Sequence, residues 1–390
     1  MKRSLLASVA FGLIVYAFSF FDAAPQAMAQ TAPSAHRAAG DAVRAGADAR
    51  TWTWWLPFTG PAQTDRLPAV IPGGQSIGIK LRASGILVVG YHLIHSGRDA
   101  VSPGIQARLH AGDVIVLVDG VRAGSVAQVA RQIDAVGKRG ARLKVMFSRH
   151  GKLYQTAIRP IYDGDSGSYR IGLYIRDSAS GVGTLTFYVP GSHSFGALGH
   201  VIADADTGEA IEGRGQIVHA AVTSIDRGES GQPGEKRGLF VDERHVVGSI
   251  ERNTEFGVFG HMLSAPDHGL VDRPVSVADP SEVHTGRAQI LTVVSGQKVE
   301  RFDVMIVRVN PQNTAQVKGL VVRVTDSSLI RRTGGIVQGM SGSPILQDGR
   351  LVGAVTHVFV SDPRQGYGIF AAWMLRSAVG IPAAVAPRAA

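Results

Sequence analysis

The stretch GMSGSP, residues 339–344, lies near the C-terminal end of the chain and decides its predicted fold. Apolar runs flank it, GIV at residues 335–337 and IL at residues 345–346, which is typical of a tight turn between two buried strands. Small residues around Ser341 let the backbone bend sharply and leave the serine hydroxyl uncrowded. Such a turn can aim the amide N–H groups of Gly339 and Ser341 at one point, where a tetrahedral oxyanion would lie.

The pattern Gly-x-Ser-Gly-x-Pro in this stretch is similar to the nucleophile loop of chymotrypsin-like serine proteases. A glycine- and serine-rich turn in an unrelated β-protein is the alternative, and the six residues alone do not decide between the two. The 390-residue chain, with 48 glycines and many Val and Ile runs, favours turn-rich β structure in two or three domains. The rest of the chain must therefore supply a base for the serine.

Composition excludes several other classes of function. The chain has no cysteine, which rules out disulfides, thiolate metal sites and a cysteine nucleophile. It contains no His-Glu-x-x-His motif for zinc and no glycine-rich nucleotide loop. The net charge of +9 comes from scattered Lys and Arg residues, which favours a solvated basic surface. We therefore expect no metal, no cofactor and no nucleic-acid partner.

Residues 1–29 are predicted to be a signal peptide or a membrane anchor. Two basic residues precede an apolar segment at residues 5–21, and AMA at residues 27–29 offers a small-x-small cleavage site. This arrangement predicts export across the cytoplasmic membrane but leaves cleavage and anchoring open. Residues 30–66 are predicted to be a linker, whose aromatic cluster at residues 52–58 either packs on the first domain or contacts a membrane surface.

Residues 67–160 are predicted to form a first folded unit that resembles a PDZ domain. It combines a glycine-centred loop that opens a strand at residues 76–81, the motif GDVIVLVDG at residues 112–120 and a helix capped by Ser125. The resemblance implies that a peptide adds as a strand to the sheet edge. Its C-terminal carboxylate would bind the N–H groups of three loop residues, Ile77, Gly78 and Ile79. A PDZ-like fold without a ligand, or with an intramolecular one, is the alternative.

Residues 163–382 are predicted to form a second unit, in which short β-rich runs alternate with turns as in a β-barrel or sandwich. His200, in the apolar segment GALGHVI, is the first candidate for the base that a serine nucleophile needs. His357, in AVTHVF, is the rival, or a residue that lines the substrate cleft. The orienting carboxylate could be Asp326 at a predicted strand end, or one of four others: Asp204, Asp206, Asp226 and Asp303.

Five segments, in order along the chain, resemble the stage IV sporulation protein B peptidase family: residues 70–78, 196–202, 233–236, 333–344 and 354–359. The resemblance implies a mainly β chain, with a PDZ domain followed by a chymotrypsin-like double β-barrel. It implies these roles: Ser341 as nucleophile, His200 as general base, Asp326 as acidic residue, and the N–H groups of Gly339 and Ser341 as the oxyanion hole. Met340 stands where chymotrypsin-like zymogens have an Asp that pairs with a new N-terminus, so activation through that ion pair is excluded.

This resemblance implies an exported regulatory serine endopeptidase of a sporulation pathway, acting between forespore and mother cell. Its implied substrate is a membrane-bound inhibitor of an intramembrane protease, and it would also cleave itself. Two alternatives belong to other classes: a PDZ scaffold with an inactive protease fold, and a quality-control protease of broad specificity. The predicted order, with the PDZ domain before the protease, disfavours the second alternative.

Overall fold

The computed structural model describes residues 67–96 and 99–381. The predicted signal peptide or anchor and the predicted linker lie outside the described residues, so both stay predictions. Within the described ranges, no helix combines the length and the apolar character needed to cross a membrane.

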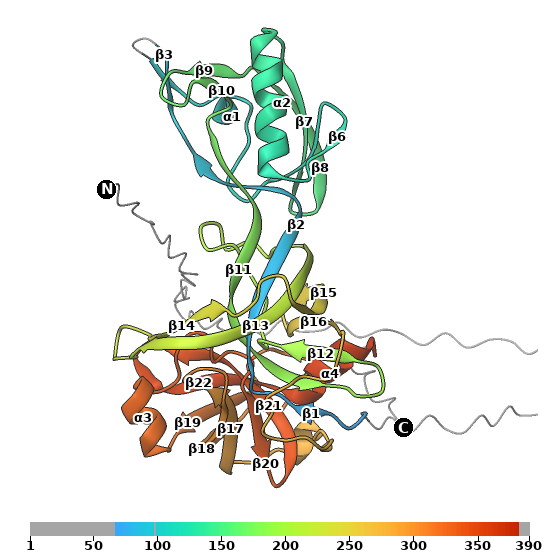
Figure 1. Ribbon diagram of the computed structural model, residues 1–390, viewed down its shortest axis with the longest axis vertical. Coiled ribbons are helices and arrows are strands. Elements are labelled where there is room, and N and C mark those ends of the chain that lie inside the picture. The colour runs from blue at the N-terminus through green and yellow to red at the C-terminus, as the bar shows by residue number, and fades with distance from the viewer. Residues whose placement is uncertain (1–66, 97–98, 382–390) are drawn as a thin grey trace, which may run out of the picture. The chain divides into compact units, whose positions relative to one another are not determined.

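Six strands form a closed ring, the first barrel (Figure 1). Each pairs antiparallel with the next in the order β2, β11, β12, β16, β15 and β13, and β13 pairs back with β2. Their bounds are β2 Ser76–Tyr91, β11 Leu173–Tyr188, β12 Ser194–Ala197, β13 Gly213–Asp226, β15 Val246–Thr254 and β16 Gly257–Met262. Two further strands join this sheet, β1 (Ile71–Pro72) on β11 and β14 (Glu235–Phe240) on β13.

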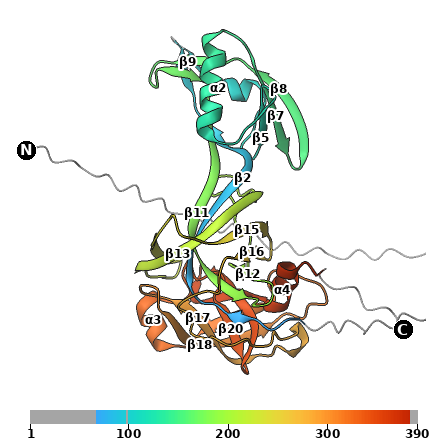
Figure 2. The ribbon, with the colours of Figure 1, turned by 45° about the vertical axis from the view of Figure 1, so that its right-hand side comes forward.

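A second closed barrel has the strand order β17, β18, β19, β22, β21 and β20 (Figures 1 and 2). Its strands are β17 Gly286–Val293, β18 Val299–Val309, β19 Leu320–Val324, β20 Pro344–Gln347, β21 Arg350–Phe359 and β22 Asp362–Phe370. Short helices accompany it: the 3-10 helix η1 (Pro280–Glu282), α3 (Ser327–Thr333) and α4 (Ala371–Val379). Phe187 and Phe259 of the first barrel belong to its hydrophobic core, so the barrels share buried apolar surface.

The PDZ-like unit is inserted between β2 and β11 of the first barrel. Its elements are β3 Ile94–Ser96, β4 Asp99–Val101, α1 Pro103–Gln106, β5 Val114–Val118, β6 Val121–Arg122, α2 Val126–Lys138, β7 Leu143–Arg149, β8 Lys152–Ile158, β9 Ile161–Asp163 and β10 Ser168–Arg170. The predicted helix is confirmed: Ser125 accepts a hydrogen bond from the Gln128 N–H, and Val129 and Ile133 are buried. They pack in one core with residues of β5 and β7. Figure 2 shows α2 next to these strands.

This insertion corrects the predicted domain boundaries. The fold class, mainly β with a PDZ-like unit and two barrels, is confirmed, but the protease does not start at residue 163. Its first barrel already begins with β2, in which Ile77 and Ile79 pair with Gly183 and Gly181 of β11 and are buried in that barrel's core. The proposed peptide-binding loop Ile77, Gly78 and Ile79 is therefore wrong, because all three residues lie near the start of a strand that is paired on both sides, with β11 and with β13.

Candidate active site

Ser341 lies in the turn before β20, and a strand of the first barrel holds this turn in place. The Thr184 N–H donates to the Ser341 carbonyl at 3.1 Å, and the Thr184 hydroxyl donates to the Gly339 carbonyl at 2.8 Å. Gly342 adopts φ +93°, and a Cβ on it would lie 2.2 Å from the Thr184 carbonyl oxygen. Only glycine fits at position 342. The close contact of the turn with β11 is therefore a second reason for the sharp bend that the sequence predicts around Ser341.

The same turn leaves two amide groups free. Within residues 67–96 and 99–381, neither the Gly339 N–H nor the Ser341 N–H has a hydrogen-bond acceptor, whereas the amides of Met340, Gly342 and Ser343 are all paired with backbone carbonyls. Backbone N–H groups are rarely left unpaired unless they face solvent or a ligand. The pair predicted to form the oxyanion hole is therefore available to bind an oxyanion.

His200 lies just after β12, in a bend, not inside a strand as its apolar surroundings predict. Leu198 (φ 68°) and Gly199 (φ 72°) form that bend. The His200 Nδ1 lies 2.8 Å from the Val201 carbonyl oxygen, and because a carbonyl only accepts, Nδ1 carries the hydrogen. Burial lowers the pKa of His200 and outweighs the opposing effect of this hydrogen bond. The imidazole is therefore neutral at pH 7 with its Nε2 lone pair free, as a general base requires.

The Ser341 hydroxyl and both candidate histidines lie around β21. The hydroxyl donates to the Thr356 carbonyl at 2.7 Å, and the next residue, His357, has its ring centroid 4.9 Å from that of His200. Loss of solvation, and then the charges of His200 and Lys318, lower the pKa of His357. No hydrogen bond joins Ser341 to either ring among the described residues, so the hydroxyl must leave Thr356 to meet the base.

In the structure Asp326 caps a helix, whereas the sequence predicted that it orients His200. Its carboxylate caps α3: one oxygen accepts from the Ser328 N–H at 2.8 Å, the Ser328 hydroxyl at 2.6 Å and the Leu329 N–H at 3.0 Å. Burial alone would raise the pKa of Asp326, but these hydrogen bonds outweigh it and lower the pKa. The assignment of Asp326 as the partner of His200 is corrected, because one of its oxygens is bound to the helix N-terminus and the other accepts from the Asp303 N–H at 3.5 Å.

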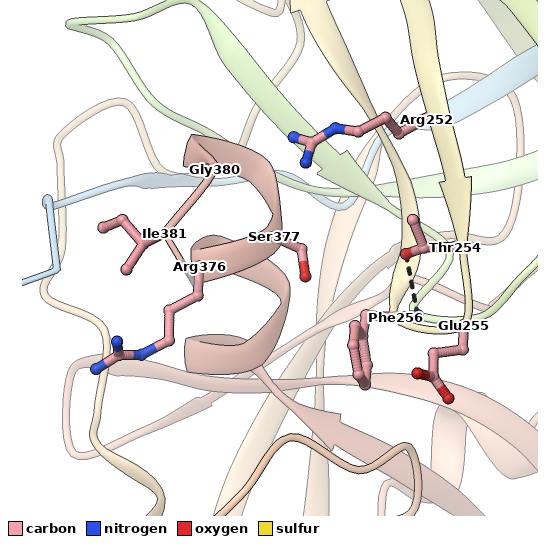
Figure 3. A pocket seen from close by; sticks show the side chains of 8 residues that line it. All are labelled: Arg252, Thr254, Glu255, Phe256, Arg376, Ser377, Gly380 and Ile381. Carbon is pink, nitrogen blue, oxygen red and sulfur yellow. Dashed lines mark hydrogen bonds between the residues drawn. The ribbon is translucent and has the colours of Figure 1, made fainter. Parts of the chain in front are cut away.

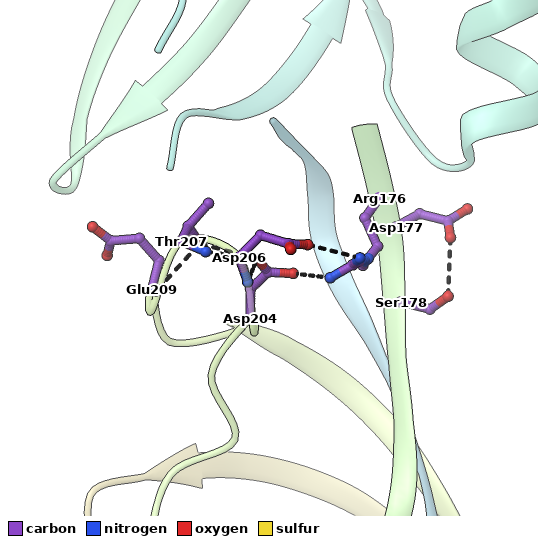
Figure 4. Close-up of polar contacts among 7 residues, drawn as sticks. All are labelled: Arg176, Asp177, Ser178, Asp204, Asp206, Thr207 and Glu209. Carbon is purple, nitrogen blue, oxygen red and sulfur yellow. Dashed lines mark hydrogen bonds and ion pairs between the residues drawn. The ribbon is translucent and has the colours of Figure 1, made fainter. Parts of the chain in front are cut away.

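The other candidate carboxylates are also engaged away from His200. Asp204 and Asp206 both pair with Arg176 of β11 (Figure 4), Asp226 pairs with Arg237, and Asp303 accepts from Gln289. Among the described residues no carboxylate is hydrogen-bonded to His200. The Val201 carbonyl occupies the place of the orienting group, so the site consists of Ser341, His200 and two free amides.

The SpoIVB peptidase S55 family matches residues 167–375, more than half of the chain. The chain belongs to the SpoIVB peptidase family. It is therefore a serine peptidase, and the predicted family is confirmed. The match covers His200 and Ser341 together with both barrels except the beginning of the first.

Other comparisons with this SpoIVB-family chain add little. No match was found among curated proteins. The PDZ domain of an SdrC-like protein from Listeria monocytogenes is 23% identical and covers 24% of this chain and 87% of its own, with a TM-score of 0.19. The Rv3671c protease from M. tuberculosis, in its active form, is 14% identical over 54% of this chain and 78% of its own, with a TM-score of 0.29. Neither score supports an argument about the site.

The PDZ-like unit of this peptidase has a second apolar-Gly-apolar loop that the sequence prediction missed. Ile171-Gly172-Leu173 opens β11, and Gly172 has φ +70° with no room for a Cβ beside His92 and Ser102. Asp177 and Asp134 tie both ends of this segment to α2, through the Val126 N–H at 3.0 Å and the Tyr169 N–H at 3.1 Å. Residues 171–173 thus form a glycine-centred loop at the start of a strand beside α2.

Two cavities lie on the protease barrels. A cavity of about 470 Å³ lies between the β15–β16 turn and α4 and is lined by Arg252, Phe256 and Arg376 among others (Figure 3). The second, of about 330 Å³, is lined by residues of the 226–235 segment together with Gln338, which is three positions before Ser341. The second cavity therefore flanks the nucleophile turn of the peptidase.

Proposed function

We propose that this serine peptidase is an exported regulatory endopeptidase that cleaves a membrane-associated regulatory protein, and itself, in a sporulation-type pathway. The family membership supports the pathway, and residues 1–29 support export. The observation that carries the catalytic part is the Ser341 turn with its two free amides, next to a neutral His200. A membrane-bound inhibitor of an intramembrane protease is the proposed substrate.

The proposed reaction starts when the Ser341 hydroxyl leaves the Thr356 carbonyl and donates to the His200 Nε2. As Ser341 Oγ attacks the peptide carbonyl, His200 takes its proton, and the Gly339 and Ser341 amides bind the oxyanion. The resulting imidazolium keeps its Nδ1–H bond to the Val201 carbonyl, which fixes the ring's orientation. His200 then protonates the leaving amine, and water, activated by the same ring, releases the acyl group.

Peptide capture is proposed for the PDZ-like unit, at the edge formed by residues 171–173 and the start of β11 beside α2. The support is the positive φ of Gly172 and the two Asp contacts that hold this segment against α2. A peptide carboxylate would bind the amides of this loop, and the peptide would add along β11. This replaces residues 77–79 as the proposed site.

A fluorophosphonate probe and a proteomic survey test the proposed function. The probe should form a covalent adduct with the purified full-length protein, and an unreactive protein would support the scaffold alternative. Comparing membrane proteins from cells with the wild-type chain and with Ser341→Ala should then reveal one or a few cleaved substrates. Many unrelated substrates would instead support the quality-control alternative and contradict a regulatory role.

A further inference from the structure

We propose that Lys236 is the positioning residue of the oxyanion site. Hydrogen bonds of its backbone and of its side chain hold the two peptide groups whose N–H bonds would bind the oxyanion. The proposal rests on the Ser341 turn being the oxyanion site of the proposed peptidase. In a trans peptide the C=O and N–H bonds point in opposite directions. An anchored carbonyl therefore determines where the N–H of the same peptide group points.

The first anchor is the backbone of Lys236 in β14. The Lys236 N–H donates to the Gln338 carbonyl at 2.9 Å, and the Gln338 N–H donates to the Gly234 carbonyl at 2.7 Å. The Gln338 carbonyl belongs to the same peptide group as the Gly339 N–H. Binding this carbonyl to β14 therefore directs the Gly339 N–H away from β14, into the open side of the turn.

The second anchor is the side chain of Lys236. Its Nζ lies 2.7 Å from the Thr292 hydroxyl, which lies 3.1 Å from the Ser343 hydroxyl, and the Ser343 hydroxyl lies 2.7 Å from the Met340 carbonyl. The Lys236 amine and the Ser343 hydroxyl both donate to the Thr292 oxygen, and the Ser343 hydroxyl also donates to the Met340 carbonyl, so one buried network connects Lys236 to Met340. The Met340 carbonyl shares its peptide group with the Ser341 N–H, which is the second oxyanion donor.

Burial makes this chain of hydrogen bonds strong and keeps the turn close to Lys236. The exposed fractions are 3% for Lys236 and 0% for Thr292 and Ser343, so water does not compete with their hydrogen bonds. Gly339 has φ +88°, and a Cβ on it would lie 3.1 Å from the Lys236 Cβ. The Ser343 hydroxyl, held in place by Thr292 and Lys236, polarises the Met340 carbonyl, and a polarised carbonyl makes the Ser341 N–H of the same peptide group a better donor.

The Lys236 amine also has an unusual electrostatic setting. Burial lowers its pKa to about 7, and no charged side chain offsets that effect. The charged residues on neighbouring positions include Glu235 and Arg237 on its own strand and Asp226 on β13, which pairs with Arg237. On β18, Glu300 lies opposite Thr292 and pairs with Arg332, and the nucleophile turn has no charged residue. In its protonated form Lys236 places a positive charge behind the oxyanion.

Steady-state kinetics on a short peptide substrate test this role, with the full-length protein and four variants. Thr292→Val interrupts the chain of hydrogen bonds, whereas Thr292→Ser retains the hydroxyl. Lys236→Met removes the amine but keeps a side chain of similar length. Lys80→Met is the control, because Lys80 pairs with Glu243 at the surface. We expect kcat to fall about 10-fold or more in Thr292→Val and Lys236→Met with little change in KM. Thr292→Ser and Lys80→Met should stay within about twofold of wild type.

The pH profile supplies a readout that a purely structural role would not change. Wild-type kcat should decline several-fold as the pH rises through about 7, and Lys236→Met should lack this decline. The same decline in both proteins, or wild-type kcat in both Thr292→Val and Lys236→Met, would overturn the proposal. If Lys236→Met does not fold, the comparison of kcat between Thr292→Val and Thr292→Ser still tests the proposal. Failure of wild-type protein to react with a fluorophosphonate would instead refute the peptidase assignment itself.

Discussion

Replacing Lys236 by Met should change how the stability of the protein depends on pH. The pKa of Lys236 is lowered to about 7 in the folded protein, against an ordinary value of 10.5 in the unfolded chain. Between these two values the unfolded chain holds a proton that the folded protein lacks. The free energy of unfolding therefore rises with pH in this window, by about 1.4 kcal/mol per pH unit from this group. Below pH 7 both states are protonated, and the full cost of burying the charge is present.

The assay is urea unfolding at several pH values between 7.5 and 9.5, in a Ser341→Ala background that prevents self-cleavage. The measured quantity is the difference in unfolding free energy between Lys236 and Lys236→Met proteins, because other titrating groups contribute equally to both. Lys236→Met should be the more stable protein by a few kcal/mol at the lower end, and the advantage should shrink as the pH rises. A difference that stays constant with pH, or that equals the one for Lys80→Met, would refute the reasoning about the buried amine.

Three further predictions concern the site residues. His200→Ala should be as inactive as Ser341→Ala, and the double variant little worse, because both residues act as one unit; an active His200→Ala beside an inactive His357→Ala in the same peptide assay would make His357 the base. Asp326→Ala should lower the unfolding free energy by about 1 kcal/mol through loss of the α3 cap while kcat stays near wild type, and an inactive but folded Asp326→Ala would restore Asp326 to the triad. Gly172→Val should weaken binding of a peptide C-terminus, measured by calorimetry, while Ser341 still reacts with a small probe; tight peptide binding by this variant would exclude the loop. Gly78→Val should instead destabilise the whole protein, because the valine side chain would meet Phe240 and Val218.

The parts of the fold that local sequence determines were predictable. The nucleophile turn follows from small residues between two apolar runs, and α2 follows from Ser125 and the spacing of its apolar residues. The loop proposed to bind peptides was not predictable from pattern alone, because residues 77–79 and 171–173 share the same apolar-Gly-apolar motif. Only the pairing of β2 with β11 and β13 reveals that the first of these lies in a barrel wall.

The orienting carboxylate shows a different limit of sequence reasoning. Asp326 directly precedes Ser327 and Ser328 at the start of a short helix, and an Asp in that position is a helix-capping signal. This signal could have identified its role. The Val201 carbonyl beside His200 could not have been found, because any residue supplies a backbone carbonyl and only the bend after β12 brings this one to the ring. The role proposed for Lys236 likewise cannot be read from the sequence, because it depends on the position of β14 next to Gly339 in the folded protein.

Mass spectrometry of the fluorophosphonate adduct tests the central claim most directly. The purified protein is treated with the probe and digested, and the modified residue is identified. The account predicts a single adduct on Ser341, and none on Ser341→Ala or His200→Ala, which lack the nucleophile and its base. An adduct on Ser343 or another serine, or undiminished labelling of Ser341→Ala, would contradict the assignment of Ser341 as the nucleophile.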